Sequence, residues 1–312
     1  MWTRLRDRAR KAWFDHRCRD IHGTPPLQCD AASPVVVVSQ LWHPDMTMYL
    51  LAAKSFARFI RPSRFVIVDD GLTDDDRDHL RHHLGVVEFV PRSSVRVEGL
   101  PVGGCWERLV TLARENQRHY AVQLDADTLT LKLPSLVAEC VRQSRTFTMG
   151  TNTGKEIVRV SQASRYARER GGDHVQIAAE SVLAELDPTD QLLYVRGCAG
   201  FTGFAPGTLS VERIASFSQR MEALLGAGKW HQWGSEQVTS NFMAANAANS
   251  VVLPFDRYPF WGPGVDVEAA VLVHFFGTYR FTDGAYVRMG RACVAEARAC
   301  AVPATPGAAA KP

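Results

Sequence analysis

The first third of the chain alternates between short apolar runs and longer amphipathic segments. Val35 to Val38 are four consecutive β-branched residues, which predicts a central strand that is buried on both faces. Further apolar runs at 65–68 and 86–90 predict two more strands, and a helical pattern separates each run from the next. Strands that alternate with helices pair in parallel. We therefore predict an α/β fold with a Rossmann-like, mostly parallel central sheet and helices on both of its faces.

A fourth predicted strand, 120–124, ends in two carboxylates, Asp125 and Asp127, which one small residue separates. The twofold periodicity of a strand aims both side chains to the same side. Two like charges held this close repel each other, and burying them unpaired would cost roughly several kcal/mol. A divalent cation removes this cost, and Mg²⁺ or Mn²⁺ prefers hard oxygen ligands. We predict a metal site here, and two solvated loop aspartates are the alternative.

Composition limits the classes of protein that the chain can belong to. Of 312 residues, 46% are apolar and 22% are charged, as in ordinary globular enzymes. The formal net charge of +3 comes without a basic cluster in the middle of the chain, so nucleic acid is not an expected partner. Seven scattered cysteines without a Cys-x-x-Cys pair predict reduced thiols. No apolar run reaches the ~20 residues of a membrane span, and we expect a cytoplasmic protein.

The N-terminal segment, residues 1–20, is rich in arginine. Four of its apolar residues fall at helical spacing on one face: Trp2, Leu5, Ala9 and Trp13. Such a helix either docks on its own domain through the aromatic face or lies on an anionic membrane surface as a peripheral contact.

The domain boundaries follow from these patterns. Residues 1–33 are predicted to be a basic helix and a linker, and residues 34–290 a single domain. Residues 291–312 are predicted to be the end of a helix and a disordered tail rich in alanine and proline.

Polar residues also follow the first two predicted strands. Val38 and Ser39 stand at the end of the first, and Asp69 and Asp70 at the end of the second. The carboxyl ends of parallel strands form the edge where a nucleotide binds, and carboxylates there hydrogen-bond ribose hydroxyls or a base. We predict that these four residues contact the ligand and that Asp69 shares a cleft with Asp125. The alternative for Asp69 and Asp70 is that they cap the next helix.

Residues 120–127 resemble the Leu-Asp-x-Asp motif of GT-A fold glycosyltransferases, which holds the metal of a nucleotide-sugar donor. Upstream, Trp106-Glu-Arg108-Leu resembles the Tyr-x-Arg-Leu motif of family 8 retaining glycosyltransferases, with Trp106 in place of Tyr. Arg108 precedes Asp125 by 17 residues (125 − 108), which matches that layout. The resemblance implies that Arg108 contacts the donor, since a guanidinium donates two parallel hydrogen bonds. A helix-surface arginine is the alternative.

The same resemblance extends to the end of the chain. His274-Phe-Phe-Gly277-Thr-Tyr-Arg280 is similar to the His-x-x-Gly-x-x-Lys motif of family 8, with Arg280 in place of Lys. It implies that His274 is the third metal ligand, after Asp125 and Asp127, and that the Gly277–Arg280 turn contacts the diphosphate. The alternative for His274 is a histidine that only packs.

Glu236 and Gln237 are similar to the Asp-Gln of family 8 that contacts the donor sugar and the reaction centre, with Glu236 in place of Asp. A retaining enzyme would use the amide oxygen of Gln237 to stabilise positive charge at the anomeric carbon. An inverting enzyme would use Glu236 or Asp266 as general base. The alternative is a helix start, with Ser235 as N-cap and Glu236 facing the helix dipole.

Two stretches before these motifs carry less information. Residues 150–190 are polar, and we predict a long irregular insertion or an acceptor-side flap. The glycine-rich stretch 198–204 permits close approach of the backbone to a ligand.

The combined expectation is a metal-dependent GT-A glycosyltransferase. It would use Mn²⁺ or Mg²⁺ and a nucleoside diphosphate sugar as donor, with a UDP-sugar favoured. The acceptor would be an unidentified glycan, lipid or small molecule. Retention follows from the family 8 likeness alone. Two alternatives stay open: a sugar-nucleotide nucleotidyltransferase, and a non-catalytic binding protein on the same scaffold. Against the first, residues 39–43 lack a glycine-rich, arginine-containing phosphate loop.

Overall fold

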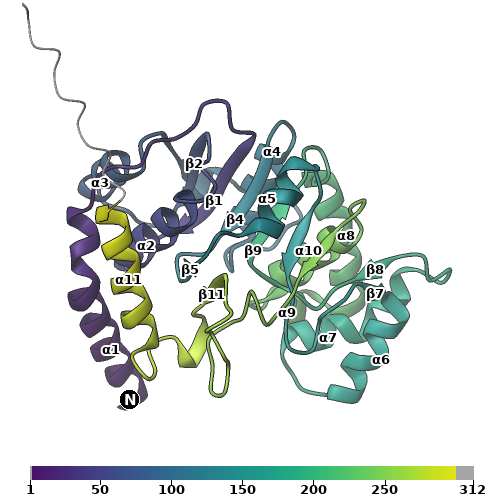
Figure 1. The fold of residues 1–312 in the computed structure, drawn as a ribbon. Coiled ribbons are helices and arrows are strands. Elements are labelled where there is room, and N and C mark those ends of the chain that lie inside the picture. The colour runs from purple at the N-terminus through teal and green to yellow at the C-terminus, as the bar shows by residue number, and fades with distance from the viewer. Residues whose placement is uncertain (1, 300–312) are drawn as a thin grey trace, which may run out of the picture.

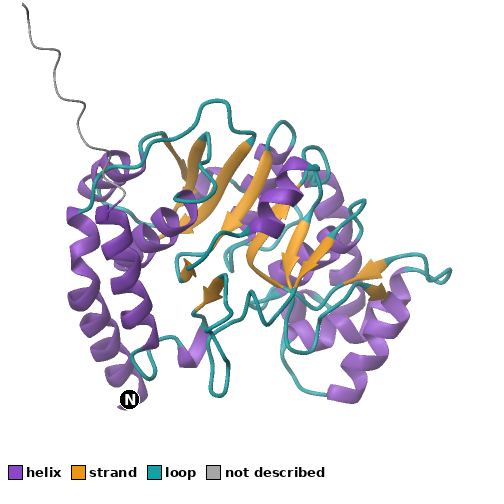
Figure 2. Cartoon of the chain, viewed as in Figure 1, coloured by secondary structure: helices purple, strands orange, loops and turns teal. Residues whose placement is uncertain are grey.

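A computed structural model describes residues 2–299 (Figure 1). Its central sheet has seven strands in the order β10-β6-β9-β4-β1-β2-β3 (Figure 2). Their bounds are Val35–Leu41 (β1), Arg64–Asp69 (β2), Val87–Pro91 (β3), Tyr120–Leu124 (β4), Phe147–Met149 (β6), Cys198–Phe204 (β9) and Val251–Leu253 (β10). Strand β1 pairs in parallel with β2 and β4, β2 with β3, and β6 with β10. Strand β9 runs antiparallel to β4 and β6. The predicted α/β class and mostly parallel sheet are confirmed.

The valine run explains why the sheet needs helices on both faces. Val35 and Val37 belong to one hydrophobic core, and Val36 and Val38 belong to the other, as the alternation of a strand requires. The first core is covered by helices α1 (Trp2–Cys18), α2 (Met46–Ala57), α3 (Asp74–Leu84), α5 (Ser135–Arg142) and α11 (Ala285–Ala299). The second is covered by α4 (Trp106–Asn116), α6 (Val160–Arg170), α7 (Val175–Val182), α8 (Val211–Leu225), α9 (Ala227–Trp230) and α10 (Ser235–Ala245).

The prediction of an irregular segment at 150–190 is wrong, because much of it is helical. Helices α6 and α7 pack against each other beside a small ladder of β7 (Val158–Arg159) and β8 (Leu193–Tyr194). The buried residues of α6 include Val160, Ala163 and Ala167, a spacing that marks one helix face. Polar residues between them hide this spacing in the composition of the segment.

Helix α1 docks on its own domain beside α11, as Figure 1 shows. Phe14 and Cys18 are buried, and the Phe14 ring centre lies 4.2 Å from that of Tyr286. The docking face therefore differs from the predicted aromatic face, since Trp13 is 49% exposed. The side chains of Trp2 and Leu5 and the predicted tail at 301–312 lie outside the described part of the chain. Among the described helices, none combines the length and apolarity that a membrane span needs.

The close packing of β9 against β6 leads to a test of the core. A Cβ added to Gly203 would lie 2.2 Å from Cε1 of the fully buried Phe147 ring. We expect Gly203→Ala to lower the free energy of unfolding by about 1–3 kcal/mol in urea denaturation, because a packed core resists an added methyl group.

Gly228→Ala is the matched control, because nothing lies within 4 Å of its added Cβ and it sits in helix α9. Alanine favours a helix, so this variant should be as stable as the unmodified chain or slightly more stable. Equal stability of the Gly203→Ala chain and the unmodified chain would contradict the packing.

Candidate metal centre and active site

A small two-stranded ladder brings distant parts of the chain to the end of β4. Strand β5 (Thr128–Thr130) pairs antiparallel with β11 (Leu272–His274), and this register sets His274 opposite Thr128. The turn before β5 is fixed by the Thr128 hydroxyl, which donates to the Asp125 carbonyl at 2.9 Å. The Phe275 N–H donates to the Asp127 carbonyl at 2.8 Å. The backbone thus holds His274 next to the two aspartates.

The three side chains predicted to bind a metal converge. Nε2 of His274 lies 3.0 Å from Oδ1 of Asp127 and 3.6 Å from Oδ2 of Asp125. One donor atom from each residue lies within 4.8 Å of the other two. Hard carboxylate oxygens and a neutral imidazole nitrogen suit Mn²⁺, and the oxygens alone suit Mg²⁺. The donor set therefore fits the predicted ion.

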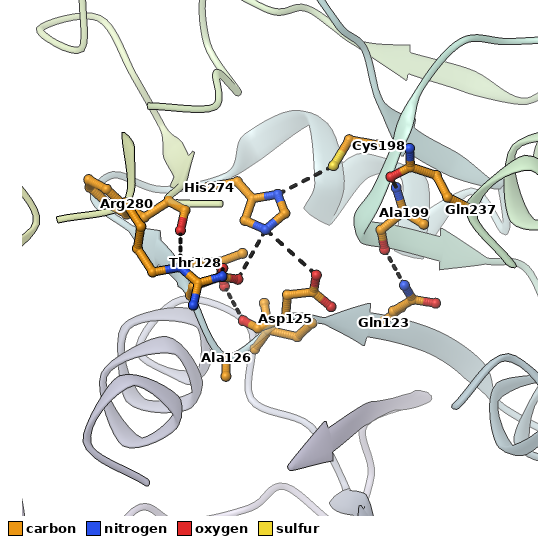
Figure 3. A network of polar contacts seen from close by, with 12 residues as sticks. Gln123, Asp125, Ala126, Thr128, Cys198, Ala199, Gln237, His274 and Arg280 are labelled. Carbon is orange, nitrogen blue, oxygen red and sulfur yellow. Dashed lines mark hydrogen bonds and ion pairs between the residues drawn. The ribbon is translucent and has the colours of Figure 1, made fainter. Parts of the chain in front are cut away.

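His274 sits in a cradle that β9 provides. Figure 3 shows its ring between Cys198 and Asp125, and Sγ of Cys198 lies 3.3 Å from Nδ1. A Cβ added to Gly200 would lie 2.2 Å from Cε1 of the ring, so the ring can occupy this place only because residue 200 is glycine. A partner on the nitrogen away from the carboxylates is the usual arrangement for a metal-binding histidine. Gly200 thus leaves room for His274, and the predicted approach of the glycine-rich stretch to a ligand stays a prediction.

Two arginines compensate the carboxylates. Arg108 pairs with Asp125 and lies 3.4 Å from Glu236, and Arg280 lies 2.6 Å from Asp127. Burial alone would raise the pKa of Asp127, but the positive charges of His274 and Arg280 outweigh it and lower this pKa. Burial would lower the pKa of His274, but Asp127 outweighs it and raises this pKa, so a bound cation would replace the imidazole proton. Asp127 is 6% exposed, so these partners are what keeps its carboxylate ionised.

A pocket of about 530 Å³ opens above this cluster. Eight of the predicted site residues line it: Arg108, Asp125, Asp127, Glu236, Gln237, His274, Gly277 and Arg280. Two aromatic side chains at the pocket are exposed to solvent, Trp233 at 72% and Phe276 at 39%. An open, partly apolar pocket beside convergent charged groups is the usual form of a small-molecule site.

Glu236 and Gln237 enter the pocket from the first turn of α10. The predicted N-cap at Ser235 is wrong: the N-cap is Gly234, whose φ of 108° lies in the left-handed region. The Ser235 hydroxyl instead accepts a hydrogen bond from Nε1 of Trp106 at 3.0 Å. Burial, and then the charge of Asp125, raise the pKa of Glu236 to about 7 although Arg108 opposes them.

A buried chain of hydrogen bonds orients Gln237. Its Nε2 donates to Oε1 of Gln176 at 3.1 Å, and Nε2 of Gln176 donates to Oε1 of Glu180 at 2.9 Å. An ionised carboxylate only accepts hydrogen bonds, so Glu180 fixes which way both amides point. The amide oxygen of Gln237 is left for the Ala199 N–H at 3.4 Å, on the wall of the pocket. The sequence gives no local sign of Gln176 or Glu180, because both lie in the segment predicted as irregular.

Val38 and Ser39 do not line the pocket. Strand β1 continues to Leu41, so both residues lie inside the sheet, fully buried, rather than at its edge. The Ser39 hydroxyl donates to the Leu124 carbonyl at 2.7 Å. Their predicted contact with a ligand is therefore corrected.

Asp69 and Asp70 lie in a separate shallow hollow at the ends of β2 and β3, not in the pocket of Asp125 as predicted. Asp69 accepts from the N–H groups of Gly71 and Leu72 and pairs with Arg77 at 2.7 Å. The helix cap proposed as the alternative for these aspartates is made by Thr73 instead. A nucleotide contact by Asp69 or Asp70 stays a prediction.

Comparisons with known proteins give similar solved structures only. No protein-family model matches the sequence, and no curated protein does. The chain is similar to core-mannan synthase A of Aspergillus fumigatus in its Mn/GDP form, with 10% identity, 74% of this chain and 75% of that chain covered, and a TM-score of 0.41. It is similar to an active-site mutant of LgtC, with 13% identity, 84% and 95% covered, and a TM-score of 0.47.

A third similar structure is mouse xyloside xylosyltransferase 1, with 12% identity, 77% of this chain and 96% of that chain covered, and a TM-score of 0.41. All three TM-scores lie below 0.5, so the functional proposal rests on the geometry of the site itself.

Proposed function

We propose that this chain is a metal-dependent glycosyltransferase that transfers a sugar from a nucleoside diphosphate sugar to an acceptor. A UDP-sugar is the donor that we favour. The observation that carries the proposal is the convergence of Asp125, Asp127 and His274 at the floor of an open pocket. Asp127 and His274 are buried and Asp125 is partly buried, and a divalent cation would join Arg108 and Arg280 in compensating the two carboxylates. The pocket above them has the volume of a small-molecule site and leaves room for the donor.

In this proposal each residue of the site has a separate task. Asp125, Asp127 and His274 hold Mn²⁺ or Mg²⁺, which when bound supplies a Lewis acid for the diphosphate leaving group. Arg280 and Arg108 offset negative charge that develops on that group. Arg280 suits this task because it is partly exposed at the pocket, whereas Arg108 is almost fully buried and mainly holds Asp125 in place.

The aromatic side chains at the pocket suit a sugar or a base. Trp233 and Phe276 line the pocket and present large apolar surfaces to solvent. An aromatic face packs against the C–H groups of a sugar or stacks on a base. We assign the bound donor to the space between these rings and the metal ligands.

The metal assignment leads to a binding test. Asp127→Asn removes one hard ligand, so we expect calorimetry to show Mn²⁺ affinity at least about tenfold weaker and no Mn²⁺-dependent binding of UDP. Asp78→Asn is the matched control, because this aspartate is exposed on α3 and pairs only with Arg81 in the same helix. Equal Mn²⁺ affinity in both variants would refute the metal site.

The alternatives make different products from the same substrates. A screen of UDP-, GDP- and CDP-sugars with Mn²⁺ should release the nucleoside diphosphate if the chain transfers sugars. With pyrophosphate added, a nucleotidyltransferase would instead convert the sugar nucleotide to a nucleoside triphosphate and a sugar 1-phosphate, and a binding protein would release nothing. The screen therefore separates all three functions.

The stereochemical course of the reaction decides which residue acts at the reaction centre: Gln237 in a retaining enzyme, or Glu236 as general base in an inverting one. We propose retention, in which the leaving phosphate takes the acceptor proton and the amide oxygen of Gln237 stabilises the anomeric carbon. Glu236→Gln should then reduce transfer only partly, and NMR of the new linkage should show the donor's anomeric configuration. Glu169→Gln, on the exposed surface of α6, is the control.

An inverted linkage would refute retention. In that case Glu236→Gln should cost ~10²–10⁴-fold in rate, because the variant would lack its general base. The pKa of Glu236, raised to about 7 by burial, would suit that role. The metal site would be unaffected by this outcome.

We also propose a peripheral contact with the cytoplasmic face of a membrane through residues 1–20, where Arg6, Arg8 and Arg17 stay exposed on the docked helix. Arginines near an anionic surface contribute about 1 kcal/mol each. The chain should therefore sediment with phosphatidylserine vesicles, and reversing the charges of Arg6 and Arg8 should weaken binding at least about tenfold. Vesicles of neutral phosphatidylcholine are the control, and equal binding to both would refute the contact.

A further inference from the structure

A second hollow, of about 270 Å³, adjoins the donor pocket. It belongs to the part of the chain formed by α6, α7, β7 and β8, which lies at the end of the molecule away from α1 and α11 (Figure 1). Its side chains include Lys155, Tyr166, Arg170 and Glu180. Nothing in the proposed donor site requires this hollow.

The two cavities meet at a rigid turn. Asn152, Thr153 and Arg196 line both of them. The turn is closed by hydrogen bonds between Thr151 and Gly154, at 3.0 and 3.3 Å. A Cβ added to Gly154 would lie 2.0 Å from the Arg196 carbonyl oxygen, so the turn is pressed against the backbone of Arg196. A molecule in the hollow can therefore reach into the donor pocket across the tip of this turn.

The hollow carries an excess of positive charge. Three cationic side chains, Lys155, Arg170 and Arg196, face two carboxylates, Glu156 and Glu180, which leaves a net charge of +1 (3 − 2). Glu180 is buried and pairs closely with Arg196, while Nη1 of Arg170 stays 3.9 Å from its carboxylate. The carboxylate of Glu180 thus faces two arginines. The guanidinium of Arg170 therefore keeps most of its N–H donors for a ligand.

We propose that this hollow is the acceptor subsite and that the acceptor carries an oxyanion, a phosphate or a carboxylate, bound by Arg170 with Arg196. This inference rests on the proposed glycosyltransferase function. The arginine forks match an oxyanion in bidentate geometry, and the phenol ring of Tyr166, 41% exposed, gives the rest of the acceptor a face to pack on. A hollow of this size holds a compact group rather than a glycan chain, since typical ligand pockets measure ~300–1,000 Å³.

The subsite is connected to the reaction centre. Arg196 pairs with Glu180, whose carboxylate orients Gln176 and through it Gln237. An oxyanion that draws on Arg196 therefore acts on the same hydrogen-bond chain that fixes the amide oxygen of Gln237. The acceptor would lie with its anionic end in the hollow and a hydroxyl over Asn152 and Thr153, towards the donor.

Inorganic phosphate and acetate are the probes for this subsite. In a ³¹P NMR titration with EDTA present, phosphate should bind saturably to the unmodified chain and about tenfold more weakly to Arg170→Gln. Arg168→Gln is the matched control, because this arginine is on the same helix, is exposed, and does not line the hollow. Acetate that displaces phosphate would assign the subsite to carboxylates as well, and acetate without effect would assign it to phosphates.

A second titration, with Mg²⁺ and without EDTA, measures UDP binding and separates this inference from the donor assignment. The UDP affinity with Mg²⁺ should not change when phosphate is saturating, nor in Arg170→Gln. Competition between phosphate and UDP, or equal weakening of phosphate binding by Arg168→Gln and Arg170→Gln, would overturn the subsite alone. Phosphate binding at Arg170 without any UDP affinity would overturn the proposed function, and with it the acceptor role.

Discussion

Two carboxylates, those of Asp125 and Asp127, stand side by side where a buried strand leaves the sheet, and their charge has to be compensated there. Arg108 comes from α4 on one face of the sheet, and Arg280 from the turn after β11. Each partner is supplied by a different part of the chain, so the pairs form only when the whole domain has closed. Both carboxylates also line the open pocket, where a metal and a diphosphate would need hard oxygen ligands.

The position of His274 depends on backbone pairing more than on its own side chain. Strand β11 is short, but its ladder with β5 fixes the histidine opposite Thr128, and β9 leaves space for the ring at Gly200. A glycine at this place serves a packing purpose, since any Cβ would occupy the position of the imidazole. The antiparallel strand β9 thus joins the sheet to the candidate metal centre, and its sequence of small residues follows from that contact.

The segment between β6 and β9 connects the candidate active site with the second hollow. Glu180 on α7 sets the direction of a hydrogen-bond chain that ends at Gln237 on α10. Because a buried amide can point either way, an ionised carboxylate at the far end is an effective means of fixing it. The pairing of Glu180 with Arg196 then connects this chain to the hollow beside the donor pocket. Segment and sheet form one site, although the sequence suggests a separate insertion.

The sequence by itself determined the strands at 65–68 and 120–124 and the alternation of strand and helix, because hydrophobic periodicity and β-branched runs are local properties. Spacing and family resemblance also predicted site roles for Asp125, Asp127, Arg108 and His274, which the structure brings together at one pocket. Only the tertiary structure decided that Ser39 lies inside the sheet, that Asp69 faces another hollow, and that α6 and α7 carry Glu180 and Gln176 to the site. Strand length, long-range pairing and the burial of polar groups depend on what the rest of the chain packs against, and no local pattern encodes them.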